Sequence, residues 1–460
     1  MLRASSLPFA SSLAPGLWLA IVEGCFAMAP QTFMGGVFLT GFALLLGADP
    51  WALGLLAAIP ALGQSAQLLT PMLLARGADR KGLTVWSSSV ARYMWAPMGV
   101  IPFLPVDAST QLGLFLALLG LSTVLAQMGG VAWTDWMADL VPDAQRGRYF
   151  GLRNAVCAIV GMGLVASGTR FLDAFPEGQR RWGFVGLVAA GLLGAVASQL
   201  TLARQPEAAR AHRRPNRAPF RSAIANRPFR RMTRVMVVWT FMIALTGPFC
   251  YAYALQELQL GYGLVGTHAL VVAALSIVSQ PWWGRLIDKR GAQFALFAAM
   301  APVCLHPVYW ATVSPDFLLP FWLDALSSGL VWPGVTLATT ALLMEVAPSG
   351  ERAGYMGVYN AATGLATCVA AVAAGALLAR LAHTPIGWGG WTVSAWQALM
   401  AVGVTARFAC LGAFWRLPRL RAPVLMIETW PGGLPDPVVT AAVPTRAESG
   451  HSTDVPSRAT

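Results

Sequence analysis

The stretch that decides the fold is Gly77-Ala78-Asp79-Arg80-Lys81-Gly82, which recurs in related form as Leu286-Ile287-Asp288-Lys289-Arg290-Gly291. The aspartates of these two copies are 209 positions apart. A second segment, Asp139 to Asn154, recurs as Glu345 to Asn360, an offset of 206 positions. Two separate repeats with nearly equal offsets indicate duplication of one structural unit.

The composition is typical of a membrane protein: 56% of the 460 residues are hydrophobic, 11% are charged, and the mean hydropathy is +0.58. The apolar residues gather in windows of about twenty or more, the length at which a helix crosses a bilayer. Twelve such windows are predicted spans, at 16–46, 51–75, 84–105, 111–137, 149–172, 182–203, 232–256, 264–283, 292–313, 317–343, 354–381 and 392–416. The repeated segments fall at equivalent places in the two sets of six. We therefore predict an all-α membrane protein with twelve transmembrane helices in two six-helix, pseudo-symmetric bundles.

Basic residues indicate the orientation. The N-terminus and every second connection carry most of them, whereas the intervening connections carry only Arg170, Arg180, Arg181 and Arg380. The acidic residues of those intervening connections are Asp49, Asp107, Asp173, Glu177, Glu257 and Asp316. The positive-inside rule then places both termini in the cytoplasm. The same distribution accounts for the net charge of +12 without a nucleic-acid partner, because no separate soluble domain with a basic face is evident.

The expected organisation is a cytoplasmic N-terminal tail (1–15), a first bundle (16–203), a basic cytoplasmic linker (204–231), a second bundle (232–416) and a disordered cytoplasmic tail (417–460). The linker is rich in arginine and contains a single carboxylate, Glu207. Its charge is expected to set topology and to contact anionic lipid head groups, with a regulatory role as the alternative. The six cysteines are dispersed and suggest neither a disulfide framework nor a metal site.

The sequence resembles the major facilitator superfamily over about residues 10–420. The signature loop of that family lies between the second and third spans and has the pattern Gly-x-x-x-Asp-Arg-x-Gly-Arg-Arg. Residues 79–82 keep its Asp-Arg-x-Gly core but lack the basic pair that follows, and residues 284–291 match the front of the pattern. The resemblance implies a secondary active or facilitative transporter of the cell (inner) membrane. Such a transporter would work by alternating access, without a cofactor.

The resemblance also implies that the repeated loops act as a latch at the cytoplasmic gate. Gly82 and Gly291 are expected to adopt positive φ in tight turns, and Asp79 and Asp288 to lie near helix N-termini. The alternatives are a plain turn with topogenic charge and, for the Pro142–Arg146 and Pro348–Arg352 segments, a scaffold role. The predicted gate residues are Gly77, Asp79, Arg80, Gly82, Gly284, Arg285, Asp288, Arg290, Gly291, Arg146 and Arg352.

Polar residues inside the spans are candidates for the transport pathway, because ionisable groups are costly in lipid. The predicted cavity or coupling residues are Glu23, Arg92, Gln127, Asp135 and Asp324. Arg92 is alternatively a link between helices, and Asp135 a partner for basic residues of the nearby loop. His268 and His306 are further hydrogen-bonding candidates.

Proton coupling through Glu23 or Asp324 is a hypothesis, because burial disfavours a charged carboxylate. One departure weakens it: many proton-coupled members of the family have an arginine three residues before the glutamine of span four, where this chain has Val124 before Gln127.

The predicted partners are a small-molecule substrate and membrane lipids, with a coupling ion (a proton or sodium) as a further hypothesis. The protein is expected to be a monomer. No phosphate-binding loop occurs in the sequence, so we expect no ATP-driven motor. No cluster of His, Cys or acidic residues suggests a metal site or an intramembrane enzyme. The alternative function is a non-transporting sensor or assembly factor with the same fold. The sequence does not identify the substrate.

Overall fold

A computed structural model of the chain describes residues 15–142, 145–207, 219–348, 351–381, 386–388 and 391–415. The predicted tails, 1–15 and 417–460, lie outside these ranges apart from Pro15. Within the described ranges the chain is helical apart from one short hairpin.

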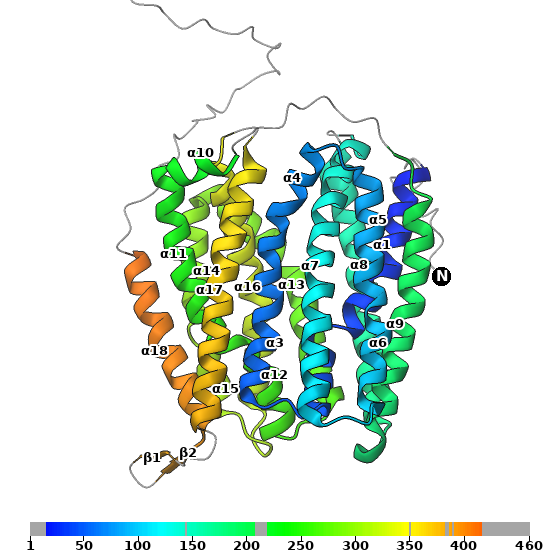
Figure 1. The fold of residues 1–460 in the computed structure, drawn as a ribbon. Helices are drawn as coiled ribbons and strands as arrows, with labels where there is room; N and C mark the ends of the chain where they lie inside the picture. Colours follow the sequence, from blue (N-terminus) through cyan, green and yellow to red (C-terminus); the bar gives the residue numbers. More distant parts are fainter. Residues whose placement is uncertain are drawn as a thin grey trace, which may run out of the picture. The chain divides into compact units, whose positions relative to one another are not determined.

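The first half of the chain forms a series of long helical elements, several of them broken by short irregular turns (Figure 1). They are α1 (Pro15–Phe33) with α2 (Gly36–Leu45); α3 (Pro50–Gly63), η3 (Gln64–Leu68) and α4 (Leu69–Ala75); α5 (Arg80–Tyr93), α6 (Trp95–Val100) and η4 (Ile101–Phe103); α7 (Ala108–Leu140); α8 (Arg146–Asp173); and η6 (Glu177–Gln179) with α9 (Arg180–Ala203).

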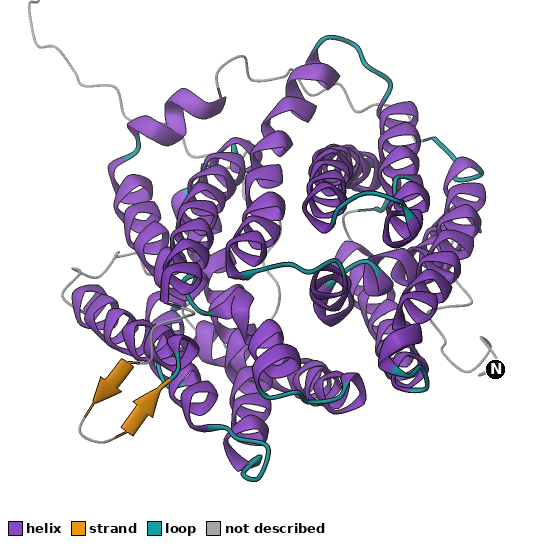
Figure 2. Cartoon of the chain, turned by 60° about the horizontal axis from the view of Figure 1, so that its bottom comes forward, coloured by secondary structure: helices purple, strands orange, loops and turns teal. Residues whose placement is uncertain are grey.

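The second half repeats this order. Its elements are α10 (Pro219–Ala225); α11 (Arg227–Ala244) with η7 (Gly247–Phe249), α12 (Cys250–Ala252) and η8 (Tyr253–Glu257); α13 (Tyr262–Arg290); α14 (Ala292–Val303) with α15 (His306–Thr312); α16 (Leu319–Val346); α17 (Arg352–Leu381); and α18 (Ala395–Trp415). Strands β1 (Ile386–Trp388) and β2 (Trp391–Val393) pair antiparallel as the hairpin, at the edge of the helices in Figure 2.

Within the described residues, eleven helices are long and apolar enough to cross a membrane. The predicted third span, 84–105, corresponds to α5, α6 and η4 and is not among the eleven. Its first part carries Arg92 and several serines, of which Ser87 donates to the Leu83 carbonyl four residues earlier at 2.5 Å. Its second part contains Pro97 and Pro102, which lack a backbone N–H. The count of twelve spans therefore stays a prediction.

The same pairs of helices contact each other in both halves. In the first half α1 packs against α8 and α9, and α5 against α7; in the second, α11 packs against α17 and α18, and α14 against α16. Between the halves, α3 packs against α17 and α8 against α13. Glycine makes these contacts close: a Cβ on Gly54 would lie 2.6 Å from the Ala371 carbonyl oxygen, and one on Gly375 2.7 Å from that of Pro50.

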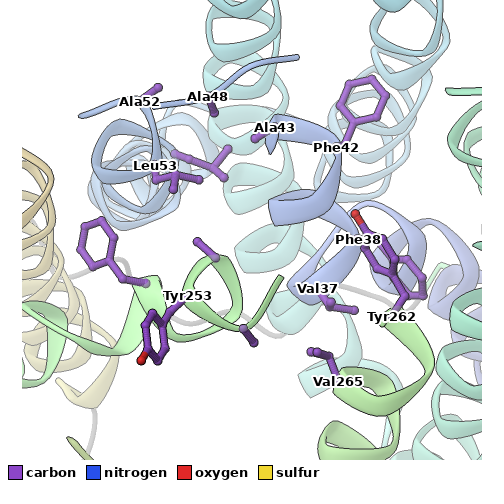
Figure 3. Close-up of a cluster of buried hydrophobic side chains, with 14 of the residues drawn as sticks. Val37, Phe38, Phe42, Ala43, Ala48, Ala52, Leu53, Tyr253, Tyr262 and Val265 are labelled. Atoms are coloured by element: carbon purple, nitrogen blue, oxygen red, sulfur yellow. The ribbon is translucent and has the colours of Figure 1, made fainter. Parts of the chain in front are cut away.

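The two ends of the helices differ. We call the end with the 76–80 loop, the start of α11 and the end of α13 the basic end; it is at the top of Figure 1. At the opposite end, buried apolar side chains of both halves form one cluster. Figure 3 shows Phe38 and Phe42 of α2 beside Tyr262 and Val265 of α13 in that cluster. Apolar packing between the halves therefore closes the opposite end.

Several helix boundaries differ from their predicted places by a few residues, and one of these differences extends a span into the predicted linker. Helix α11 begins at Arg227, inside the segment predicted as a linker, and not at 232. The reason is local: the Asn226 side chain accepts a hydrogen bond from the Phe229 N–H at 3.1 Å and caps the helix.

Candidate functional site

The first signature loop is a helix cap. Asp79 is the N-cap of α5, and its carboxylate accepts hydrogen bonds from the backbone N–H groups of Lys81 at 3.2 Å and Gly82 at 2.6 Å. Gly77, and not Gly82, has the positive φ, at +94°. The expectation for Gly82 is therefore wrong: the turn precedes the cap, and Gly82 lies in the first helical turn.

Arg80 is turned into the protein. Its side chain is buried, forms an ion pair with Asp139 at the end of α7, and lies 3.9 Å from Asp135. The carboxylate of Asp135 is half exposed. The structure thus gives Asp135 a partner at the basic end, as one reading of the sequence expects, and joins the start of α5 to the end of α7.

The second signature loop is built differently. Helix α13 continues to Arg290, so Asp288 lies in its last turn and not near a helix N-terminus, which makes that expectation wrong. Gly291 has a φ of +84° and links α13 directly to α14. Four of the other predicted gate residues occupy open positions. Gly284 would accept a Cβ without contact; Arg285, Arg290 and Arg352 are exposed; and Arg146 begins α8, with its side chain outside the description.

Glu23 forms a cluster of charges inside the first half. Its carboxylate is 3% exposed and lies 3.6 Å from a guanidinium nitrogen of Arg92 and 3.6 Å from one of Arg153. Ser198 on α9 donates to Glu23 at 2.7 Å and accepts from Arg92 at 2.6 Å. Two guanidinium groups therefore pair with this carboxylate, and Arg92 links α5 to α1 and α9.

Asp324 forms the corresponding cluster of the second half. It is 4% exposed; one carboxylate oxygen lies 3.0 Å from His268 Nε2, and the other lies 3.9 Å from His306 Nδ1. The second oxygen has no hydrogen-bond partner among the described residues. His306 in turn contacts the hydroxyls of Ser327 at 3.0 Å and Ser328 at 3.3 Å. Both ion-pair partners of this carboxylate among the described residues are therefore imidazoles, whereas those of Glu23 are guanidinium groups.

Arg407 is a buried charge that the sequence reasoning missed. It is 3% exposed in α18 and donates to the backbone carbonyls of Val303 at 3.0 Å and Ile243 at 3.4 Å, and to the Thr246 hydroxyl. The rule that singled out Arg92, a lone ionisable residue within an apolar window, also applies to Arg407. Arg153 was overlooked because it lies near a loop in the sequence.

A chain of amides crosses between the halves. Gln67 of η3 donates to Gln127 of α7 at 2.8 Å, and Asn360 of α17 donates to Gln67 at 3.2 Å. The structure therefore places Gln127, a predicted cavity residue, in contact with the second half through a neighbour. Gln67 and Asn360 are polar side chains in otherwise apolar helices, and that is the signal that could have paired them.

Asp173 caps a helix of the other half. Its carboxylate, at the end of α8, accepts from the backbone N–H groups of Tyr262 at 3.0 Å and Gly263 at 2.6 Å, the first residues of α13. The N-cap residue of α13 is Gly261, which has no side chain to do this. The Arg180 guanidinium lies 5.5 Å from the centre of the Tyr262 ring. A single carboxylate thus ties the two halves together at the opposite end.

A hollow of about 1290 Å³ opens beside this contact. Residues of both halves line it, and its charged members are Asp49, Glu177, Arg180 and Glu257. The apolar cluster and the Asp173 cap lie at its edge, since Tyr262 belongs to all three. The hollow therefore borders the contact between the halves that closes the end opposite the basic end.

The comparisons with known proteins agree with this geometry. The sequence matches the Major Facilitator Superfamily over residues 19–371. No curated protein matches it. Solved structures with a similar fold include a mutant form of the nucleoside transporter NupG, with a TM-score of 0.68 at 10% identity over 87% of this chain and 98% of that one.

Two further solved structures have the same fold. A POT family peptide transporter in an auto-inhibited form gives a TM-score of 0.66 at 12% identity, over 89% of this chain and 98% of that one. A D-xylose-proton symporter gives 0.61 at 13% identity, over 86% and 96%. The predicted family and the predicted transport function are both confirmed, and the substrate is not identified. The chain is a multi-pass membrane transporter that belongs to the Major Facilitator Superfamily.

Proposed function

We propose that this transporter moves its solute by alternating access between two six-helix bundles, residues 16–203 and 232–416. It acts as a monomer in the cell (inner) membrane, with both termini in the cytoplasm. The repeated helix contacts support the two bundles, and the distribution of basic residues supports the orientation. The loop at Asp79 and Arg80 then lies at the cytoplasmic gate, where it acts as the latch.

The observation that carries this proposal is the bond between Asp173 and the first residues of α13. It joins the bundles at the end where apolar packing also closes the pathway. Opening toward the outside has to break the cap and expose the cluster around Phe42 and Tyr262. The structure then corresponds to an inward-facing state, and the hollow of 1290 Å³ is the outer vestibule.

Replacing Asp173 by alanine tests the proposal. Losing an N-cap carboxylate costs about 1 kcal/mol, so the population of the outward-open form should rise about five-fold. Hydrogen exchange of segments 37–46 and 258–267, followed by mass spectrometry, measures the opening. The matched control is Asp49→Ala, because Asp49 caps α3 within its own half, with a 2.8 Å bond from Ala52 N–H. Equal exchange in the two variants would contradict a role between the halves.

We also propose that Asp324, with His268 and His306, binds the coupling proton, and that Glu23 does not. Asp324 has an unsatisfied oxygen and titratable neighbours, whereas Glu23 is held between two arginines. Screening solutes by thermal shift and then measuring flux in proteoliposomes under imposed pH and sodium gradients tests coupling directly. Flux that responds to sodium and not to pH would remove the proton from the proposal.

A further inference from the structure

Four arginines share one face at the start of α11. Arg227, Arg230, Arg231 and Arg234 have the spacing i, i+3, i+4, i+7, which aligns side chains along a helix. With Val235 they line a surface hollow of about 530 Å³. Arg227, Arg230 and Arg234 are exposed and Arg231 is half-buried.

This concentration of charge is electrostatically unfavourable without a ligand. No carboxylate among the described residues forms an ion pair with the four guanidinium groups. Cations at a helix N-terminus also face the positive end of the helix dipole, where anions are preferred. Like charges three and four residues apart repel one another as well. Because this face departs so strongly from the charge pattern that stabilises a helix, we expect it to have a function.

The backbone of α11 leaves the guanidinium groups as the donors at this site. The Asn226 side chain already accepts from the Phe229 N–H, and Pro228 has no N–H to offer. Arginine forks match phosphate oxygens in a bidentate way. An anion here would therefore be held by side chains arranged around it.

The same face becomes apolar one turn further along the helix. Val235 borders the arginines, and Val238 is 46% exposed on the line that Arg227, Arg231 and Arg234 define. The other face of α11 is buried, through Phe229 and Met232. Beside the site, α10 packs across the end of α11 and exposes 56% of Ile224 (Figure 1). A basic segment followed by an apolar segment matches the order of the head group and the acyl chain in a phospholipid.

We infer that the first two turns of α11 form a binding site for one anionic phospholipid. Its phosphate lies among Arg227, Arg230, Arg231 and Arg234, and an acyl chain lies along Val235 and Val238. A free phosphate satisfies the arginines but leaves the exposed valines uncovered, so the apolar continuation favours the lipid.

The experiment titrates detergent-purified full-length protein with phosphatidylglycerol and follows the melting temperature. The double variant R230Q/R234Q should bind about thirty-fold more weakly than the unmodified chain, because each basic residue contributes about five-fold at an anionic surface. The control R76Q/R204Q removes the same charge from exposed arginines outside the site and should bind normally. R230K/R234K should be intermediate, since lysine keeps the charge and loses the fork.

Three arms of the titration distinguish the sources of the phosphate and can overturn the inference. Inorganic phosphate giving the same stabilisation at the same concentration would identify a soluble anion as the ligand. Phosphatidylcholine acting as strongly as phosphatidylglycerol would show that the arginines are not the recognition element. Equal losses in R230Q/R234Q and R76Q/R204Q would show a diffuse effect of net charge.

Discussion

The two halves of this transporter bury their charges in different chemistries. In the first half, Arg92 extends from α5 to Ser198 on α9 and to Glu23 on α1. In the second half, Arg407 extends from α18 to a carbonyl of α14 and to Thr246. Ser198 and Arg407 are 209 positions apart, the offset of the repeated loops. An arginine therefore joins the corresponding pair of helices in both halves. In the first half it lies on α5 and reaches α9, whereas in the second half it lies on α18, at the position that corresponds to Ser198 of α9, and reaches α14.

The carboxylates show the consequence. Glu23 pairs with two arginines, whereas Asp324 pairs with two histidines. A guanidinium stays protonated at physiological pH, whereas an imidazole is the side chain whose ordinary pKa lies near that range. In the function proposed above, the first cluster is therefore a fixed framework and the second cluster is the site that responds to protons.

The strongest test of the comparison is Glu23→Gln. The change leaves Arg92 and Arg153 without a carboxylate in a buried site, and breaking a buried pair in this way costs about 3–5 kcal/mol. The melting temperature of the purified protein should therefore fall sharply at all pH values. Arg92→Gln should cost less, because Glu23 keeps Arg153. A variant E23Q as stable as the unmodified chain would show that the first cluster is not structural.

The second test is Asp324→Asn, whose carboxamide can still hydrogen-bond to His268. We expect folding to be kept and coupling to be lost. With one proton coupled, a gradient of one pH unit drives about ten-fold accumulation, since it corresponds to about 1.4 kcal/mol. Accumulation in proteoliposomes should fall to none, while exchange without a gradient continues. Asp316→Asn is the control, as that carboxylate is exposed in the loop before α16. Unchanged accumulation in D324N would place the coupling elsewhere.

The smallest effect is expected at Asp107, an exposed carboxylate that caps α7 and serves as a reference for both buried ones. Hydrogen bonds from the Ser109 and Thr110 hydroxyls and the Thr110 N–H lower the pKa of Asp107 below its ordinary 3.8. A lowered pKa in the folded state means that the stabilisation is complete above pH 3.8 and is lost as pH falls below it. Asp107→Ala should lower the melting temperature slightly at pH 7, with a difference that shrinks in acid. A difference independent of pH would contradict the cap.

Much of the fold follows from the sequence because hydrophobic length and loop charge act locally. A helix must be long enough to cross hydrocarbon, so the apolar windows predict most of the observed elements. The third span is the exception, since α5 is polar along one face and is broken at Met94. The two loops show the same limit: Asp79 and Asp288 occupy matched positions in the sequence, yet α13 simply continues through the second.

The sequence predicts which residues belong to the candidate sites, but it does not predict which residues they contact. Glu23, Arg92 and Asp324 stand out because a charge in an apolar window is costly. Their contacts join residues 18 to 175 positions apart, and nothing local in the sequence specifies such pairings. In the sequence Asp173 looks like any other loop acid, because its role as a cap depends on a helix of the other half.

The sequence by itself determined the membrane environment, the duplication and the family, since these depend on composition, on spacing and on loops that repeat. The tertiary structure alone decided which carboxylate pairs with arginines and which with histidines, and which end is closed. The physical reason is that the ionisation of a buried acid and the closure of a pathway depend on the neighbours that helix packing supplies. Glu23 and Asp324 are each a buried acid in an apolar stretch of helix, and they differ through those neighbours.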